Sequence, residues 1–155
     1  MSNYLVQEKE LPNLCIAGIR TKGRYADCGK VFGKLCSKLF FRIGGKPMML
    51  TYDTQFRETD ADFEPCFPVK PGKSVDGIDI RDIPGGRFFT LVHKGPYDQL
   101  HSAYSQLFET IKTKGLVQKT PGREVYLKGP GMLFRGNPKN YLTEVQIGVE
   151  EPSLG

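Results

Sequence analysis

The stretch HKGPY, residues 93–97, ends a run of strand-forming residues and opens a helical pattern. Before it, GGRFFTLV is rich in aromatic and aliphatic side chains and is bounded by glycine, which is typical of a strand. Pro96 suits the first turn of a helix, where an amide donor would have no partner. Apolar residues then recur every three or four positions until Gly115, at Tyr97, Leu100, Tyr104, Leu107 and Ile111. The stretch therefore predicts a tight turn from a strand into a helix.

A near copy of this stretch, TKGRY, occupies residues 21–25, about half a chain length earlier. It follows NLCIAGIR, which predicts a strand, and precedes a second apolar stripe that ends before Gly44 and Gly45. After each helix come two more strand-like runs. They are KPMMLTYD and DFEPCFPV in the first half, and REVYLKGP and YLTEVQIGV in the second. Each half therefore predicts the order strand, helix, strand, strand.

The repeated order predicts an α+β fold built by tandem duplication. We expect repeat one at about residues 11–70 and repeat two at about residues 78–150, within one domain that spans residues 1–155. The two halves would form two antiparallel-rich sheets about a pseudo-twofold axis, with a central ligand groove between them.

Two glutamates occupy matching positions in the last strands of the two halves. DADFEPCFPV aligns without a gap with NYLTEVQIGV, which places Glu64 opposite Glu144. Alternation in the second run puts Val145, Ile147 and Val149 on a core face and Glu144 on the other face. Pro65 and Pro68 fit only an edge strand or a bulge. A shared groove lined by both acids is one interpretation; an exposed Glu144, or one paired with a lysine, is the alternative.

Aromatic residues near these strands favour a site for organic cations, since an aromatic face attracts positive charge. The candidates are Tyr52 and Tyr126 on matching strands and Phe134 in the loop of residues 129–140. Ordinary core packing is the alternative for each of them.

Charge and composition argue against several other functions. The formal charge of +5 comes from 22 basic residues scattered among 17 acids, so no basic run indicates a nucleic-acid surface. The four cysteines form no CxxC pair, and we expect no metal site and no cofactor. No apolar run approaches the roughly 18 residues of a membrane span, and the N-terminus lacks the apolar stretch of a signal peptide. We therefore expect a cytoplasmic protein without membrane contact.

The runs GRFFTLVHKGPYDQLHSAYSQLFETI, REVYLKGPG and NPKNYLTEVQIGVE resemble the GyrI-like small-molecule-binding family. They also resemble the effector-binding domains of AraC-type and BmrR-type multidrug-responsive regulators. The resemblance implies a groove between two repeats that binds lipophilic, often cationic compounds. It also implies that Glu144 faces the ligand, with aromatic side chains around it.

The resemblance implies a stand-alone binding module, because 155 residues filled by the repeated unit leave no room for a DNA-binding domain. A protein partner is possible, as in the family's gyrase-inhibitory namesake. Some members of the family resemble hydrolases that open cyclopropane-containing alkylating compounds. In that alternative Glu64 and Glu144 would be catalytic, one as general acid and the other orienting water.

Overall fold

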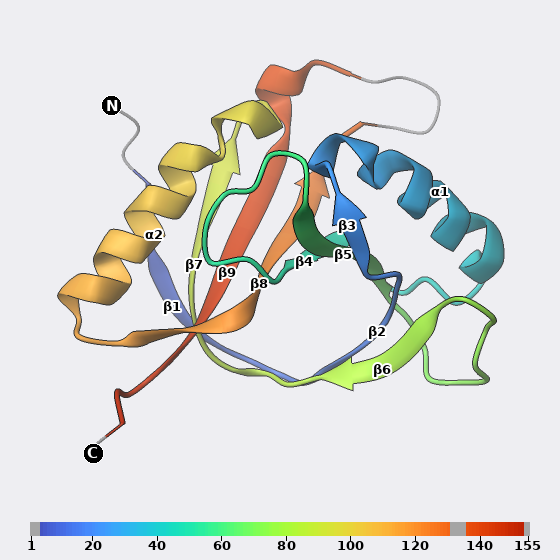
Figure 1. The fold of residues 1–155 in the computed structure, drawn as a ribbon, viewed down its shortest axis with the longest axis horizontal. Helices are drawn as coiled ribbons and strands as arrows, with labels where there is room; N and C mark the ends of the chain where they lie inside the picture. Colours follow the sequence, from blue (N-terminus) through green and yellow to red (C-terminus); the bar gives the residue numbers. More distant parts are fainter. Residues whose placement is uncertain (1–3, 131–135, 154–155) are drawn as a thin grey trace.

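The computed structural model describes residues 4–130 and 136–153. Within these residues, nine strands form one sheet in which all paired strands are antiparallel, and two α-helices lie over its two halves, α2 at the left and α1 at the right of Figure 1. The strands are β1 (Gln7–Leu11), β2 (Leu14–Gly18), β3 (Thr21–Gly23), β4 (Met48–Thr51), β5 (Ala61–Pro68), β6 (Asp79–Ile83), β7 (Gly86–Lys94), β8 (Val117–Lys128) and β9 (Leu142–Glu150). The helices are α1 (Cys28–Leu39) and α2 (His101–Thr113), with 3-10 turns η1 (Tyr25–Asp27), η2 (Tyr97–Gln99) and η3 (Pro138–Asn140).

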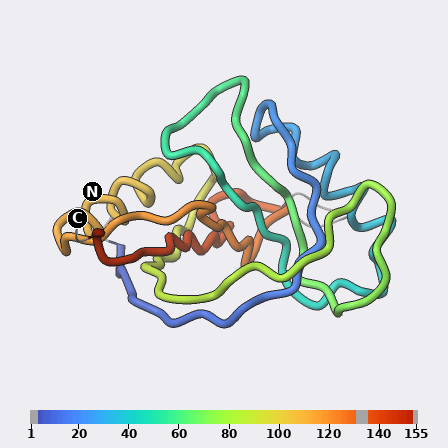
Figure 2. The backbone as a smooth tube through the Cα atoms, turned by 60° about the horizontal axis from the view of Figure 1, so that its bottom comes forward, coloured from blue at the N-terminus to red at the C-terminus, as the bar shows by residue number. Residues whose placement is uncertain are grey.

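The strand order is β1-β7-β9-β8-β4-β5-β2-β6, and β3 also pairs with β5. The sheet is curled, and the segments that join β1 to β2 and β6 to β7 pass from one half of it to the other (Figure 2). These two segments meet where the backbone N–H of Gly85 donates to Oδ1 of Asn13 at 2.7 Å. The α+β prediction is thus confirmed, although the described strands form one sheet rather than two.

The predicted helices and their flanking strands are present, with three differences. The run NLCIAGIRTKG forms two strands, β2 and β3, instead of one. Strands β1 and β6 were not predicted from the sequence. Their sequences, QEKEL and DIRDI, are rich in charged residues, which obscure the regular apolar alternation that marks a strand.

Pro65 lies inside the sheet, contrary to the expectation of an edge strand. Strand β5 pairs with β4 on one side and with β2 and β3 on the other. The break between β2 and β3 lies opposite Pro65, whose carbonyl oxygen accepts the N–H of Ile19 at 3.2 Å. The interruption accommodates a residue that has no amide donor for the ladder.

Both helices pack on the same face of the sheet. On this face α2 covers Phe89, Val145 and Ile147, while α1 covers Ala17 and Phe67. The predicted core side of the last strand is therefore confirmed. Neither described helix is long and apolar enough to cross a membrane.

Candidate functional site: a buried carboxylate between two helices

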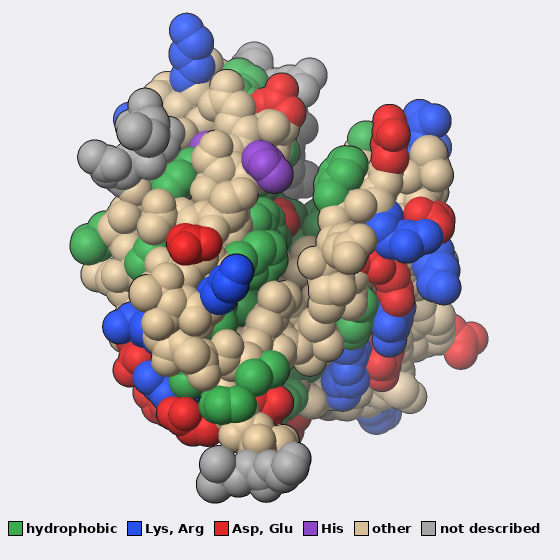
Figure 3. All heavy atoms as spheres, turned by 60° about the vertical axis from the view of Figure 1, so that its left-hand side comes forward, with side chains coloured by type: hydrophobic (Ala, Val, Ile, Leu, Met, Phe, Trp, Pro, Cys, Tyr) green, Lys and Arg blue, Asp and Glu red, His purple; other side chains and the backbone are tan. Residues whose placement is uncertain are grey.

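The surface is deeply hollowed between the two lobes of the molecule, and hydrophobic side chains line the hollow (Figure 3). Side chains from both helices and from the central strand β8 converge on the helix-bearing face. Tyr104 comes from α2 and contacts Glu124 of β8, while Phe32 of α1 contacts Tyr126 of the same strand. We name this region the helix-side cleft and define it by Tyr25, Tyr97, Tyr104, Glu124 and Tyr126.

Glu124 is the acid of this cleft, and its side chain is buried, with 8% of the residue exposed. It accepts a hydrogen bond from the hydroxyl of Tyr126 at 2.8 Å and another from the hydroxyl of Tyr104. Burial raises the pKa of the Glu124 carboxyl, and the two phenol hydrogen bonds oppose that rise. Within residues 4–130 and 136–153, no lysine, arginine or histidine forms an ion pair with it.

One wall of the cleft is a chain of aromatic contacts around Tyr126. Its ring lies 5.5 Å from that of Tyr97 and 6.1 Å from that of Phe32, both edge-on. The Tyr97 ring is in turn 5.2 Å from that of Tyr141. Burial raises the pKa of Tyr97 to about 12, so its phenol stays neutral at physiological pH. This wall presents ring surface and hydroxyl groups without a fixed charge.

A second group of aromatic residues extends from the first half of the chain. The Tyr25 ring lies 5.0 Å from that of Phe63 and 6.3 Å from that of Phe56. Phe56 is 79% exposed, which is unusual for so large an apolar side chain. Burial, with a smaller contribution from nearby acids including Glu124, raises the pKa of Tyr25 to about 12.

Glu144, one of the predicted site residues, lies on the opposite face of the sheet. It pairs in register with Val92 and Val125, whereas Glu124 points to the helix-bearing face. Its carboxylate accepts a hydrogen bond from Lys9 Nζ at 3.2 Å and one from Gln146 Nε2 at 2.5 Å. The structure thus contains a Glu144 that is paired with a lysine, Lys9, which is one of the alternatives that the sequence left open.

Glu64 and Tyr52 also lie on the face away from the helices. The Glu64 carboxylate is 1% exposed and accepts two hydrogen bonds from Arg81, each at 2.8 Å. The Tyr52 hydroxyl donates to the same carboxylate at 2.6 Å. Burial and the Glu64 carboxylate raise the pKa of the Tyr52 phenol. The guanidinium of Arg20 stacks 3.7 Å from the centre of the Tyr52 ring.

The structure therefore brings Glu64 and Tyr52 together but does not bring Glu64 close to Glu144. Strands β8 and β4 lie between the strands that carry the two acids, so their backbones are roughly 14 Å apart. Each acid has its own basic partner. Tyr126 lies in the helix-side cleft, on the face opposite to Glu64 and Glu144. Phe134 lies outside the described residues.

Glu124 is the cleft residue that the sequence reasoning missed. The run REVYLKGP contained a signal for Glu124, because Tyr126 in the same run was already a predicted ligand-binding residue. Residues two apart on a strand share a face, so Glu124 follows directly from the placement of Tyr126. The sequence reasoning chose Glu144 instead, because it aligns with Glu64 and because the family resemblance assigns the ligand-facing acid to the YLTE motif.

The described part of the chain contains no cluster of metal ligands and no activated thiol. No group of three or more His, Cys, Asp or Glu side chains there could hold a metal ion. Cys15, Cys28, Cys36 and Cys66 are free thiols. Burial raises the pKa of Cys28 and Cys66, which keeps both in the unreactive protonated form.

An acid-centred, aromatic-walled cleft on a curled antiparallel sheet defines a small-molecule-binding domain. The sequence matches the model of the GyrI-like small molecule binding domain over residues 6–150. The chain thus belongs to the GyrI-like family. A comparison with curated protein sequences finds no match.

Solved structures share the fold over nearly the whole chain. The C-terminal domain of EcmrR is 25% identical, with a TM-score of 0.83, and the match covers 96% of this chain and 99% of that domain. An EcmrR–DNA complex gives 25% identity, a TM-score of 0.84 and 96% coverage, but this chain spans only 58% of the EcmrR chain there.

Two more distant structures show the same fold. A hydrolase from Listeria innocua is 16% identical with a TM-score of 0.68, covering 94% of this chain and 91% of that one. SAV2435 bound to tetraphenylphosphonium is 14% identical with a TM-score of 0.58, covering 96% and 94% of the two chains.

Proposed function

We propose that this protein binds lipophilic organic cations in the helix-side cleft, with Glu124 as the negative charge. The observation that carries the proposal is the burial of Glu124 without a basic partner in the described residues. An unpaired buried carboxylate is costly, and a cation that enters the cleft would offset this cost. The rings of Tyr97 and Tyr126 would add cation–π contact, worth about 0.5–2 kcal/mol each.

The two halves support a duplicated origin for this cleft, which we also propose. From β7 to β2 the sheet reads β7-β9-β8, then β4-β5-β2. Each half contributes the strand before its helix, the last strand and the strand after its helix, in mirrored order. A pseudo-twofold axis between β8 and β4 would relate them and would run through the cleft floor.

The relatives suggest the probe and the biological setting. SAV2435 has the same fold and its structure contains tetraphenylphosphonium, a lipophilic cation. EcmrR carries the matching domain within a longer chain seen on DNA. For this chain, a regulatory role and a protein partner remain proposals.

Titration with tetraphenylphosphonium tests the cation site. We expect Glu124→Gln to weaken binding at neutral pH by about tenfold or more, because the amide keeps the shape but removes the charge. Glu144→Gln is the matched control, since it makes the same chemical change on the opposite face. The affinity should be measured by isothermal titration calorimetry on both variants and on the wild type.

The control also separates the two candidate acids. Equal affinity of Glu124→Gln and wild type would reject the proposed site. If only Glu144→Gln lost affinity, the ligand-facing role implied by the family resemblance would be restored to Glu144. Binding reduced in neither variant, with a folded protein in both, would exclude charge recognition by either glutamate.

One feature favours the hydrolase alternative: a carboxyl with a raised pKa, Glu124, can act as a general acid. The predicted pair does not provide a second catalytic group, because Glu64 and Glu144 lie on the other face. Turnover of a cyclopropane-bearing alkylating compound, lost in Glu124→Gln, would establish an enzyme. Absence of turnover across a panel of such compounds would leave binding as the function.

A further inference from the structure

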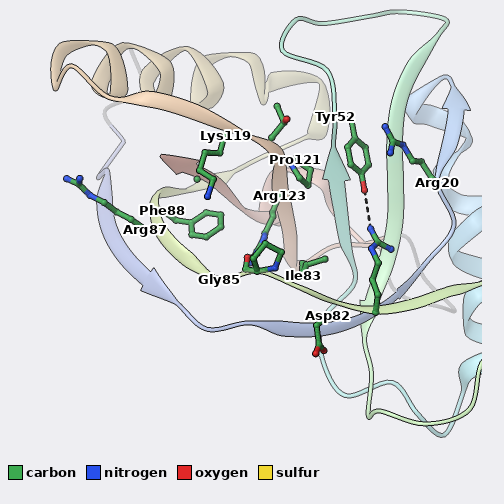
Figure 4. Close-up of a pocket in the computed structure, with 14 residues that line it drawn as sticks. Arg20, Tyr52, Asp82, Ile83, Gly85, Arg87, Phe88, Lys119, Pro121 and Arg123 are labelled. Carbon is green, nitrogen blue, oxygen red and sulfur yellow. Dashed lines mark hydrogen bonds between the residues drawn. The ribbon is translucent and has the colours of Figure 1, made fainter. Parts of the chain in front are cut away.

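A second concavity lies on the face of the sheet that carries no helix. It is a pocket of about 330 Å³ between β8, β9 and the segment that joins β6 to β7. We name it the basic pocket and define it by Ile83, Pro84, Phe88, Lys119, Arg123 and Gly148. Arg20 and Tyr52 line its other end (Figure 4). Arg81 also lines the pocket. The proposed cation site in the helix-side cleft is on the opposite side of the same strand, β8.

Arg123 is a buried cation in this pocket, and only 5% of the residue is exposed. One of its guanidinium N–H groups donates to the carbonyl oxygen of Pro84 at 2.7 Å. The guanidinium lies 4.5 Å from the centre of the Phe88 ring. No carboxylate among residues 4–130 and 136–153 forms an ion pair with it. Burial accordingly lowers the pKa of the Arg123 guanidinium.

Arg123 and Lys119 differ from the other basic residues around the pocket. Arg81 pairs with Glu64 and Asp79, and Arg20 pairs with Asp62. Arg87 pairs with two glutamates on the surface. Lys119 forms no ion pair within the described residues, so Lys119 and Arg123 leave the pocket with uncompensated positive charge.

The acidic lining residue does not neutralise this charge. Asp82 is the acid among the residues that line the pocket. Its side chain points away from Lys119 and Arg123, which both extend toward the region of Phe88 (Figure 4). The positive potential therefore stays concentrated at one end of the pocket, beside the Phe88 ring.

Gly148 leaves the space that an occupant needs. It pairs with Phe88 on one side and with Lys119 on the other, so these three residues form a row across three strands. A methyl group at position 148 would lie 3.4 Å from the Phe88 ring and 3.6 Å from Cβ of Lys119. A larger side chain would fill the gap between them. The absence of a side chain at this position keeps the pocket open.

We propose that the basic pocket binds a small organic anion, in which a carboxylate or phosphate group is joined to an apolar ring or chain. The anionic group lies between Lys119 and Arg123, where it offsets the cost of the buried guanidinium. The apolar part packs against Phe88 and Ile83. Arg123 can donate further hydrogen bonds to the anion while it keeps its bond to Pro84.

Titration of phenyl phosphate and benzoate into the whole protein tests this proposal, with benzyl alcohol as the neutral analogue. We expect saturable binding of at least one anion, with a rise in the melting temperature, and no comparable effect of benzyl alcohol. The anion that binds more tightly shows whether the pocket prefers a phosphate or a carboxylate group. The affinity for the anion should fall as the salt concentration rises, because salt screens the attraction between the anion and the basic residues.

Three variants locate the anion. Lys119→Gln, an exposed change, should weaken binding by about threefold. Arg123→Lys keeps the charge but loses the planar fork and should weaken binding by about tenfold. Gly148→Leu should abolish binding by filling the pocket. Arg57→Gln is the matched control, since Arg57 does not line the pocket and is already paired with Asp60 on the surface, and this variant should bind as the wild type does.

Two results would overturn the proposal. The first is that neither anion binds more tightly than benzyl alcohol. The second is that both Lys119→Gln and Gly148→Leu bind the anion with wild-type affinity. This second test can be carried out even if Arg123→Lys fails to fold. Tetraphenylphosphonium binding by the same variants measures whether the helix-side cleft, on the other face of the sheet, is intact. Loss of anion binding with unchanged cation binding therefore distinguishes this proposal from failure of the cation site.

Discussion

The hydroxyl of Tyr126 donates a 2.8 Å hydrogen bond to Glu124, two residues earlier on the same strand. Both side chains therefore point to the helix-bearing face, where Tyr104 of α2 donates a second hydrogen bond to the same carboxylate. Two phenols that bond to one buried acid can support its ionised form without neutralising it.

The first prediction concerns the stability of the unliganded protein. The pKa of Glu124 is raised in the folded state above its ordinary value of 4.5. The stability from the protonated carboxyl is therefore fully present below that value and is lost as the pH rises through the folded pKa. As the pH rises, we expect the free energy of unfolding of the wild type to fall relative to that of Glu124→Gln. The fall should be about 1.4 kcal/mol for each unit by which folding raises the pKa of Glu124.

Urea unfolding of both proteins between about pH 5 and pH 8 measures this difference. Glu124→Gln keeps an acceptor for Tyr126 and serves as the non-titrating reference. A free-energy difference that stays constant across this range would contradict a raised pKa at Glu124.

The second prediction concerns the pH dependence of cation binding. A bound cation favours the ionised carboxylate, so binding should release a proton from Glu124 wherever the free protein holds it protonated. The affinity for tetraphenylphosphonium should then rise with pH, by up to about tenfold per pH unit below the pKa of the free carboxyl. Calorimetry in buffers of different ionisation enthalpy would detect the proton, and Glu124→Gln should show neither effect.

The third prediction concerns the phenols. The hydrogen bonds from Tyr104 and Tyr126 lower the pKa of Glu124, so removal of either hydroxyl should raise it further. We expect Tyr126→Phe and Tyr104→Phe each to weaken cation binding at neutral pH by about tenfold, although both rings remain. Tyr52→Phe, on the other face, is the control, and a loss in that variant equal to the other two would place the ligand near Tyr52.

The fourth prediction separates a structural ion pair from the binding site. Glu64 is fully buried and depends on Arg81 and Tyr52 for its hydrogen bonds. Arg81→Met should destabilise the protein by about 3 kcal/mol, because it leaves a buried carboxylate without its cation. At a temperature where the variant is folded, its affinity for tetraphenylphosphonium should be unchanged. A stable variant with weakened cation binding would assign Glu64 to the ligand instead.

Much of the fold follows from local patterns in the sequence. Alternation placed Val145 and Ile147 in the core, and the glycines and Pro96 located the turns from strand to helix. Strands β1 and β6 were not predicted because charged residues make up most of each sequence, although they pair with β7 and β2 and Ile83 of β6 is buried. Such strands carry no hydrophobic period for the sequence to show.

The candidate site was harder to locate, because alternation separates two faces without showing what covers each of them. Glu144 and Glu124 are each followed by a valine on a strand, yet Glu144 lies beside Lys9 and Glu124 beside Tyr104. A lysine partner for Glu144 was one of the alternatives that the sequence left open, but Lys9 belongs to a strand that was not predicted, so this particular lysine could not be identified.

The pairing of the outermost strands ties the two halves into a single unit. Strand β1, at the beginning of the first half, completes the sheet beside β7, and β6, at the beginning of the second, completes it beside β2. Neither half has its full sheet unless the other is folded, so the chain should melt cooperatively in one transition. An occupant of the helix-side cleft or of the basic pocket would consequently protect the entire molecule, including strands that it never touches.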